Sequence, residues 1–338
     1  MRILVSGCAG FMGRWVADEL NKKGHEVYGV DDFSGGFERN IPKGINFTRL
    51  DLRNEDATRT LMEHIRPDVI QHLAAHPHEG LSQFNPIDIF TTTCNASLNL
   101  MKAEINCDVK RFVFYSSMAR YGNGENGKYQ PPFDETTPSS PVDVYGAAKV
   151  AAETSLEALA QTHGMEYVIL VPHNVAGEFQ NLSDPYRNVL AIWINSLMRN
   201  KSLYIYGDGN QERSFSFIKD SLNCYVKCSS NENLNGEVIN IGGGNPIKLK
   251  EAVQITQEEF GSEQEIIYVP KRPREVKRSF CTIKKSQELL GYEDKTDFRT
   301  GIREMITWAK SVGPVEPRYL PFLEIEKNVP ITWKNQLI

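Results

Sequence analysis

The chain has 338 residues, of which 40% are hydrophobic and 24% charged. This length exceeds that of most single domains and the composition is globular, so we expect two domains or one large core with a second lobe. A formal net charge of −5 provides no excess of cationic side chains, which argues against partners such as nucleic acid or a membrane surface. No membrane span or signal peptide is recognisable, so a cytoplasmic location is expected.

Short apolar runs rich in β-branched residues alternate with longer helical patterns through the first half of the chain, as in βαβ units. The predicted strands are Ile3–Ser6, Glu26–Val30, Asn46–Leu50, Asp68–Leu73, Arg111–Ser116 and Tyr167–Val171. The predicted helices are Phe11–Lys23, Asp56–His64, Pro86–Ile105 and Asp143–Thr162. This alternation predicts an α/β fold with a doubly wound parallel sheet.

The alternation breaks after Val171, where a loop rich in Asn, Gly, Ser and Pro covers Asn174–Asn188. A second lobe should begin there. The stretch Glu237–Gly242 again has the pattern of a buried strand, so the chain is expected to return to the first lobe. We therefore expect one lobe built from residues 1–175 and 214–243, and a smaller α/β lobe built from residues 176–213 and 244–338.

A glycine-rich loop directly follows the first strand, because Gly7-Cys-Ala-Gly10-Phe-Met-Gly13 opens the first helix. Glycines allow a tight turn and a close approach to a pyrophosphate, whose charge the helix N-terminus favours. A plain strand-to-helix turn also needs glycine, but Asp31 ends the second strand, where a carboxylate can bind an adenosine ribose. Asp31 and Asp32 would repel a 2′-phosphate, so NAD is expected rather than NADP.

Two further strand ends lie at the edge where ligands bind in open α/β sheets. Asp51-Leu52 follows the third strand, and His72-Leu73-Ala74-Ala75 follows the fourth. Taken alone, each is explained equally well as a strand-end turn. His76-Pro-His78-Glu79 offers metal-ligating side chains, but it lacks a spaced third ligand. Solvated loop residues are the better interpretation, and no metal is expected.

A tyrosine and a lysine four residues apart suggest proton transfer. Tyr145 and Lys149 share one face of a predicted helix. A phenol is a poor base at neutral pH, and a neighbouring ammonium favours its ionised form. Ser116 and Ser117 end the predicted fifth strand, and their hydroxyls could hydrogen-bond a substrate oxygen and the phenol. A tyrosine and a lysine at this spacing are common in helices by chance. After a glycine loop and a strand that ends in Ser-Ser, however, they indicate hydride chemistry at a sugar or alcohol carbon.

At this point the sequence resembles the extended short-chain dehydrogenase/reductase superfamily, and within it the NAD-dependent nucleotide-sugar epimerases and dehydratases, most of all the UDP-glucose 4-epimerases. The resemblance covers nearly the whole chain. It rests on Gly7-x-x-Gly10-x-x-Gly13, Asp31-Asp32, Asp51-Leu52, His72-Leu-Ala-Ala75, Ser116-Ser117-x-x-x-Tyr121-Gly122, Tyr145-x-x-x-Lys149, His173-Asn174-Val175, Tyr206-Gly-Asp-Gly209-x-x-x-Arg213 and Arg272-Pro-x-Glu275-Val276.

The resemblance implies a Rossmann lobe with bound NAD, a smaller substrate lobe and a catalytic triad of Ser117, Tyr145 and Lys149. The implied cofactor-binding residues are Gly7, Gly10, Phe11, Met12, Gly13, Asp31, Asp32, Asp51, Leu52, Leu73, Ala74, Ala75, Ser116, Tyr145 and Lys149. The implied contacts with a nucleotide-diphosphate sugar come from Ser117, Asn174, Arg213, Arg272 and Glu275.

Three further points follow from the same resemblance. A homodimer is implied, paired through the helices predicted at Pro86–Ile105 and Asp143–Thr162. The family often has Asn where this chain has Thr93, which leaves one cofactor contact open. Ser279 aligns with a position where epimerases restricted to plain hexoses tend to have a bulky aromatic residue, so an N-acetyl group would fit unless Ser279 points away from the pocket.

The implied reaction is 4-epimerisation. Related dehydratases and decarboxylases carry an acid after the catalytic Ser or Thr, whereas this chain has Met118-Ala119, which cannot move a proton. Tyr145 would take the hydroxyl proton, and the C4 hydride would pass to NAD and return to the other face of a transient 4-keto sugar. UDP-hexoses or their N-acetyl forms are the expected substrates. A reductase or dehydratase remains an alternative, as does a non-catalytic NAD-binding regulator.

Overall fold

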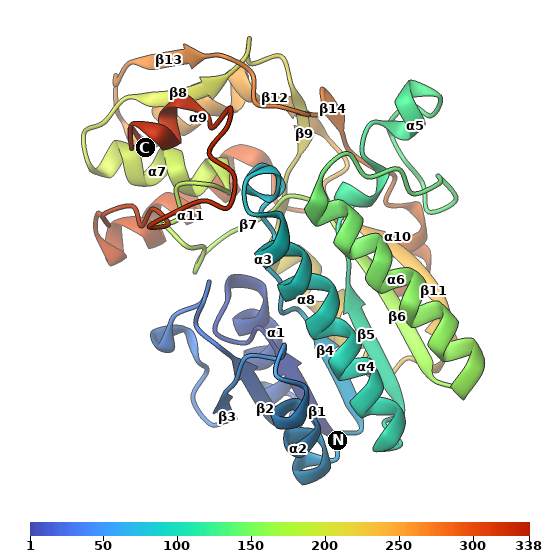
Figure 1. Ribbon diagram of the computed structural model, residues 1–338. Coiled ribbons are helices and arrows are strands. Elements are labelled where there is room, and N and C mark those ends of the chain that lie inside the picture. Colours follow the sequence, from blue (N-terminus) through green and yellow to red (C-terminus); the bar gives the residue numbers. More distant parts are fainter.

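The computed structural model describes all 338 residues. Its larger lobe is built on a seven-stranded parallel sheet in the order β11-β6-β5-β4-β1-β2-β3 (Figure 1). The strands are β1 (Arg2–Ser6), β2 (Glu26–Asp31), β3 (Asn46–Arg49), β4 (Val69–His72), β5 (Arg111–Tyr115), β6 (Glu166–Pro172) and β11 (Glu237–Ile241). The strand order reverses between β1 and β4, and ligands bind at the carboxyl ends of the strands beside such a switch point.

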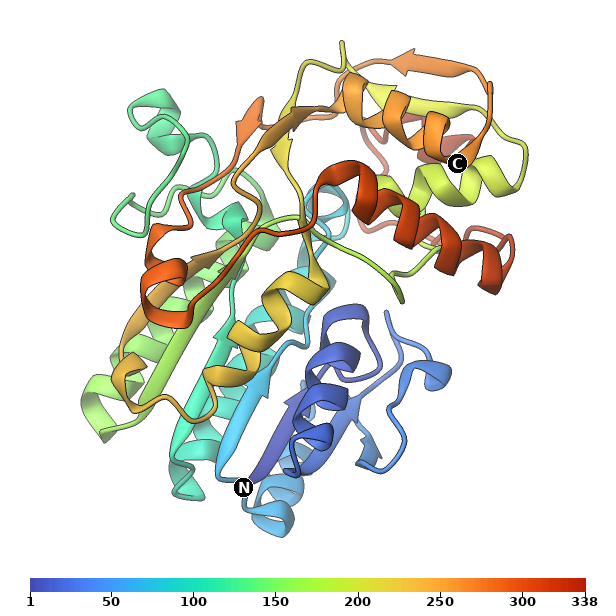
Figure 2. The same cartoon turned by 180° about the vertical axis from the view of Figure 1, so that it is seen from behind.

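Helices cover both faces of this sheet (Figures 1 and 2). One layer contains α2 (Glu55–Ile65), α4 (Ala96–Asn106) and α6 (Val144–His163), and the other contains α1 (Phe11–Lys22), α8 (Ile218–Lys227) and α10 (Lys284–Leu290). Alternate strand residues serve the two layers: Ile3 and Val5 pack with α1 and α8, whereas Leu4 packs with α2 and α4. The predicted doubly wound sheet is confirmed.

The smaller lobe lies beyond the carboxyl ends of the strands (Figure 1). Its core is formed by α7 (Val189–Met198), α9 (Leu249–Phe260) and α11 (Phe298–Val312). Its short strands are the pair β8 (Leu203–Tyr206) and β13 (Ile266–Val269), the set β12 (Pro246–Lys248), β9 (Glu212–Ser214) and β14 (Arg278–Ser279), and the pair β7 (Val175–Ala176) and β10 (Ser216–Phe217). None of the helices is both long and apolar enough to cross a membrane.

The predicted strands of the first half are all present, with bounds that agree to within one residue. The predicted helix Pro86–Ile105 needs a correction, because it is α3 (Pro86–Phe90), a π-helical turn η3 (Thr91–Asn95) and then α4. The other short helical elements are η1 (Glu38–Asn40), η2 (Leu81–Gln83), η4 (Met118–Tyr121), α5 (Gly124–Gly127), η5 (Glu232–Leu234) and α12 (Ile331–Lys334).

Candidate active site

Two adjoining cavities lie between the sheet and the smaller lobe. The first, about 260 Å³, is lined by the glycine loop, by the loops after β2, β3, β4 and β5, and by the start of α6. The second, about 220 Å³, lies deeper in the smaller lobe and is lined by β8 and by residues 272–276. Seven residues line both cavities, including Glu79, Asn174 and Arg187. The two cavities therefore form one continuous site with two compartments.

The glycine loop presents the N-terminus of α1 to the first cavity. Gly10 is the N-cap and contributes no side-chain cap, and the first turn has no acidic residue. The first-turn N–H groups have no acceptor within a helix, so they are available to a ligand. A Cβ at Gly13 would lie 2.0 Å from the Gly7 carbonyl oxygen, so only glycine lets the helix pack this closely on the loop. This geometry fits the pyrophosphate of NAD.

The carboxylate of Asp31 is anchored at the wall of the same cavity. Its Oδ2 accepts a hydrogen bond from the N–H of Ala9 at 3.0 Å, and its Oδ1 accepts one from the N–H of Phe33 at 2.8 Å. Burial raises the pKa of Asp31, and these backbone N–H groups oppose that rise. Each oxygen keeps a lone pair for a ribose hydroxyl. Asp32 also lines the cavity, with Oδ1 held by the N–H and hydroxyl of Ser34.

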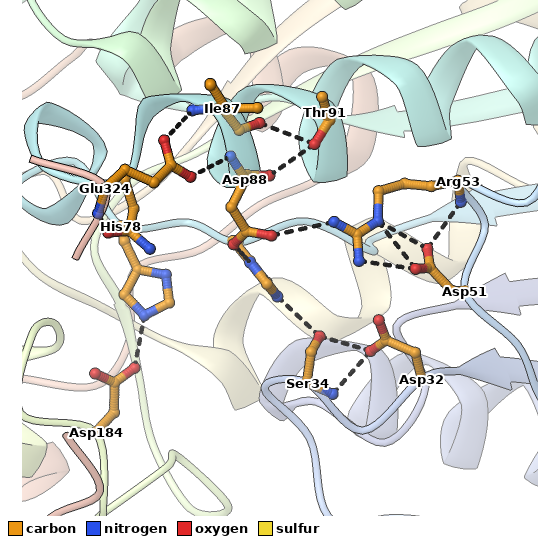
Figure 3. A network of polar contacts seen from close by, with 12 residues as sticks. Asp32, Ser34, Asp51, Arg53, His78, Ile87, Asp88, Thr91, Asp184 and Glu324 are labelled. Atoms are coloured by element: carbon orange, nitrogen blue, oxygen red, sulfur yellow. Dashed lines mark hydrogen bonds and ion pairs between the residues drawn. The ribbon is translucent and has the colours of Figure 1, made fainter. Parts of the chain in front are cut away.

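A chain of polar contacts joins the strand ends around this compartment (Figure 3). Arg53 donates to Asp51 Oδ2 at 3.0 Å and 2.8 Å, to Asp51 Oδ1 at 3.1 Å, and to Asp88 on α3 at 3.1 Å. His76 links Asp88 Oδ2, at 3.0 Å, with the Ser34 hydroxyl, at 2.8 Å. The hydrogen bond with His76 lowers the pKa of Asp88. Asp51 thus lines the cavity already paired with an arginine.

The two histidines of the loop after β4 do not share a site. His76 contacts Asp88, whereas His78 Nε2 lies 2.8 Å from Asp184 Oδ2 (Figure 3). Each imidazole therefore has its own carboxylate partner, from a different part of the chain. These contacts tie the loop to α3 on one side and to the smaller lobe on the other.

A buried hydrogen-bond chain positions Leu73, Ala74 and Ala75, which line the first cavity. The hydroxyl of Ser6 accepts from the N–H groups of Leu73 and Ala74, both at 3.1 Å, so it donates to His72 Nδ1 at 2.6 Å. The proton of His72 is then on Nε2, which donates to Ser97 at 2.8 Å. Burial lowers the pKa of His72 to about 3, so the ring stays neutral. His72 and its hydrogen bonds therefore hold the carboxyl end of β4 in place.

Ser117, Tyr145 and Lys149 meet on the first cavity. Asp143 caps α6 by accepting from the Gly146 N–H at 2.8 Å, and this fixes the turn that carries Tyr145. Lys149 Nζ donates to the Tyr115 carbonyl at 2.6 Å and lies 6.0 Å from the centre of the Tyr145 ring. The strand β5 and the helix α6 thus place the hydroxyl, the phenol and the ammonium on one wall.

The electrostatics of this wall are set by burial. Burial lowers the pKa of Lys149 to about 7, and the nearby Glu153 carboxylate opposes that fall. Burial raises the pKa of Tyr145, and its hydrogen bond with Ser117 opposes that rise. Glu153 is buried too, where it accepts from the Ser116 hydroxyl and pairs with Arg120 at 3.1 Å. Ser116 is therefore held by Glu153, one helical turn beyond Lys149.

The substrate residues that the resemblance implies divide between the compartments. Asn174 lines both cavities, and its Nδ2 donates to the Ser214 carbonyl at 2.9 Å. Arg213, Arg272 and Glu275 line only the second cavity. Arg213 donates to the Val276 carbonyl at 2.8 Å, and burial lowers its pKa. A buried, well-anchored arginine is suited to an anionic ligand.

Arg272 and Glu275 form a pair in the second cavity. Arg272 Nη2 donates to Glu275 Oε1 at 3.2 Å, and its guanidinium lies 4.7 Å from the centre of the Tyr206 ring. The other oxygen, Oε2 of Glu275, is buried without a hydrogen-bond partner in the chain. A buried acceptor without a partner costs free energy unless a ligand or water satisfies it. The second compartment is therefore built to take polar groups of a ligand.

Sequence reasoning missed two carboxylates of the site. Glu79 lines both cavities, and Asp143 lines the second. Burial raises the pKa of Asp143 to about 7, with a further rise from the charge of Glu79. Asp143 was detectable as an N-cap before the helix that carries Tyr145. Glu79 was noted only as a loop residue, because nothing local shows that its loop faces α6.

The position of Thr93 also differs from that of its neighbours. Thr92 and Ala96 line the first cavity, whereas Thr93 is fully buried and does not line it. The Thr93 carbonyl accepts from the Ser97 hydroxyl at 2.6 Å within the π-helical turn. The extra residue of that turn changes which side chain faces the cavity.

Comparisons with known proteins agree with this geometry. Residues 3–242 match the family described as the NAD dependent epimerase/dehydratase family. The UDP-glucose 4-epimerase of Mycolicibacterium smegmatis is 29% identical over 318 residues, which are 92% of this chain and 99% of that protein.

Two solved structures have the same fold. A Thermotoga maritima UDP-glucose 4-epimerase with UDP-glucose has a TM-score of 0.86 and 29% identity, over 92% of this chain and 99% of that one. A Thermus thermophilus UDP-glucose 4-epimerase in complex with NAD has a TM-score of 0.84 and 29% identity, over 91% and 98%. Together with a site that fits NAD, these likenesses show that the chain belongs to the NAD-dependent epimerase/dehydratase family.

Proposed function

We propose that this protein is a nucleotide-sugar 4-epimerase that acts on UDP-hexoses. The observation that carries the proposal is the meeting of Ser117, Tyr145 and Lys149 on a cavity that the uncapped N-terminus of α1 also faces. The similarity to UDP-glucose 4-epimerases supports the choice of reaction and of nucleotide. NAD, when bound, supplies a reversible hydride acceptor.

The residues of the chain supply binding, orientation and proton transfer. Tyr145 removes the proton of the C4 hydroxyl and later returns it, and Ser117 hydrogen-bonds the same oxygen. In its ammonium form, Lys149 lies beside the phenol and favours the phenolate. The first cavity takes the dinucleotide along the glycine loop, Asp31 and the strand ends.

The second compartment would hold the nucleoside diphosphate. Arg213 and Asn174 meet the diphosphate, because a guanidinium matches the geometry of phosphate oxygens. The free Oε2 of Glu275 accepts a hydroxyl of the nucleoside, with Arg272 beside it. In this proposal, residues 1–175 and 214–243 form the NAD lobe together with α10, which covers the same sheet, and the remaining residues form the sugar-nucleotide lobe.

Met118 and Ala119 favour epimerisation over elimination. Both are buried at the first turn after Ser117, and neither carries a titratable group. The sulfur of Met118 lies 3.4 Å from the Ser279 hydroxyl and 3.6 Å from Asn174 Nδ2. Ser279 itself lines neither cavity, but it packs against Met118, which lines the first, so we propose that it acts on the C2 substituent through Met118.

The proposal extends to assembly and location. A homodimer paired through α3, α4 and α6 and a cytoplasmic location follow from the family resemblance.

The proposed function is tested by incubating the purified protein with UDP-, GDP- and dTDP-sugars without added cofactor and following products by proton NMR. We expect conversion of a UDP-hexose to its C4 epimer. Conversion of only GDP- or dTDP-sugars would contradict the choice of UDP. Absence of any epimer would contradict the proposed epimerase function.

A further inference from the structure

The last 25 residues contribute to the lining of the second compartment. This segment, residues 314–338, is here called the strap. It follows α11, is mostly irregular and ends with the short helix α12. It lies outside the matched residues 3–242. In Figure 1 it is the dark red chain that passes from the smaller lobe toward α3 and back to α7 and β8.

The strap is anchored on the larger lobe at the start of α3. The carboxylate of Glu324 accepts from the N–H groups of Ile87, at 2.8 Å, and Asp88, at 2.9 Å (Figure 3). The Ile325 N–H donates to the Phe84 carbonyl at 2.9 Å. These bonds satisfy helix N–H groups that otherwise have no acceptor in the helix, so the strap position is specific.

The strap is also anchored on the smaller lobe. The N–H of Leu320 donates to the Tyr186 hydroxyl at 2.9 Å, and the Thr332 hydroxyl bonds that of Tyr206. The Tyr319 hydroxyl meets the backbone of Ile338 at 3.0 Å, which closes the segment into a loop. Because it is tied to both lobes, the strap spans the gap between them.

Trp333 is the residue that the strap inserts into the site. Its side chain is nearly buried and packs edge-on against Tyr186, at 5.1 Å between ring centres, and Phe84, at 5.7 Å. Trp333 also lines the second cavity. A Cβ on Gly80 would lie 3.3 Å from the Arg272 guanidinium and 3.4 Å from the Trp333 ring, so the two side chains flank one glycine.

The indole has both an apolar surface and a free donor. Its N–H makes no hydrogen bond within the chain and is not among the buried unsatisfied atoms. An aromatic ring near Arg272, in the cavity that Arg213 also lines, suits a ligand with an anionic group and a flat base, as in a nucleoside diphosphate. Of the other rings that line this cavity, Tyr206 is covered by the Arg272 guanidinium and Tyr186 packs against Trp333 itself.

We propose that the strap is part of the nucleotide site and that Trp333 contacts the nucleoside diphosphate portion of the substrate. This inference rests on the proposed function, because it takes the second compartment as the nucleotide site. The strap then has two effects. It supplies a ligand contact that only the folded strap brings into place, and its hydrogen bonds tie the start of α3 to the smaller lobe.

Trp333→Ala tests the contact. UDP is the probe, with its Kd measured by calorimetry and the KM for UDP-glucose measured in parallel. We expect both constants to rise about tenfold, because base–aromatic contacts have effects of this order, while kcat and the NAD content stay near those of the parent. Trp333→Phe should recover most of the affinity. The matched control is Lys334→Ala, an exposed neighbour on the same helix.

Hydrogen exchange of the unchanged protein provides a second test that needs no variant. Addition of UDP should slow exchange of the amides in residues 331–338. A folded Trp333→Ala protein with unchanged Kd for UDP, or absence of protection in a parent that binds UDP, overturns the inference and leaves the proposed function standing. A parent that neither binds UDP nor epimerises a UDP-hexose overturns both.

Discussion

At the scale of single residues, the site depends on a phenol whose ionisation the protein must assist. Burial raises the pKa of Tyr145 and lowers the pKa of Lys149 to about 7. The sequence pattern predicted the pair and their shared helix face. The pattern did not reveal that Lys149 Nζ is bonded to the Tyr115 carbonyl, since that contact joins positions 34 residues apart.

Tyr145→Phe tests the proton-transfer role. The phenyl ring fills the same space, so folding and the NAD content of the purified protein should be preserved. Turnover should fall about 10²- to 10⁴-fold, the usual contribution of a positioned acid or base. Initial rates of epimerisation measure the effect. Turnover near that of the parent protein would remove Tyr145 from the reaction.

Ser279→Tyr tests the space beside the sugar. Because Ser279 lies against Met118 near Asn174, a tyrosine should overpack the region where a C2 substituent is expected, at a cost of about 1–3 kcal/mol. The ratio kcat/KM should drop far more for UDP-N-acetylglucosamine than for UDP-glucose. Equal losses on the two sugars, or a parent inactive on the acetylated sugar, would contradict this role.

Glu104 carries a pH-dependent cost to stability. Both carboxyl oxygens are buried without partners on α4, and burial raises the pKa well above its usual value of 4.5. The folded state therefore retains a proton that the unfolded chain releases above about pH 4.5. The stability that this group contributes therefore falls as the pH rises from about 4.5 through the raised pKa of the folded state.

Glu104→Met should accordingly stabilise the protein, by about 1–3 kcal/mol at pH 8 and by less at pH 5. Urea denaturation at both pH values measures the difference. Glu63→Met, on the exposed surface of α2, is the control and should change stability by no more than about 0.5 kcal/mol. A gain at pH 5 as large as that at pH 8 would show that the carboxyl does not titrate as described.

At the scale of elements, the strands and helices of the larger lobe follow the sequence closely. Their apolar runs are long enough for their periodicity to be read. The π-helical turn at Thr91–Asn95 was not predicted, because one extra residue does not interrupt an apolar pattern. The two- and three-residue strands of the smaller lobe, such as β7 and β14, are too short to show alternation. Their positions depend on partners far along the chain.

The contact between α1 and the glycine loop can be tested at Gly13. A Cβ there would lie 2.0 Å from the Gly7 carbonyl oxygen, a backbone atom that cannot move aside easily. Gly13→Ala should push α1 from the loop, so the NAD content should fall sharply and the melting temperature should decrease. Gly244→Ala is the control, because a Cβ there would make only ordinary contacts, with Ile283 at 3.5 Å and Asp294 at 3.7 Å. Full NAD occupancy in Gly13→Ala would contradict this packing argument.

At the scale of the whole molecule, function depends on bringing distant segments together. The cofactor residues were predicted because each strand end carries a recognisable motif. Glu79 on the loop after β4 and Asp143 at the start of α6 face the same cavity only in the folded larger lobe, and Trp333 reaches it only because the strap folds back over the smaller lobe.

The central claim is that a hydride leaves C4 and returns to C4 within one active site. The direct test is to incubate the purified protein with UDP-glucose deuterated at C4, without added cofactor, and to follow the sugar by NMR. The account predicts UDP-galactose that still carries deuterium at C4, and one tightly held NAD per chain released on denaturation. Loss of the label to solvent or its migration to C6 would contradict the account, as would inactivity until NADPH is supplied followed by stoichiometric reduction.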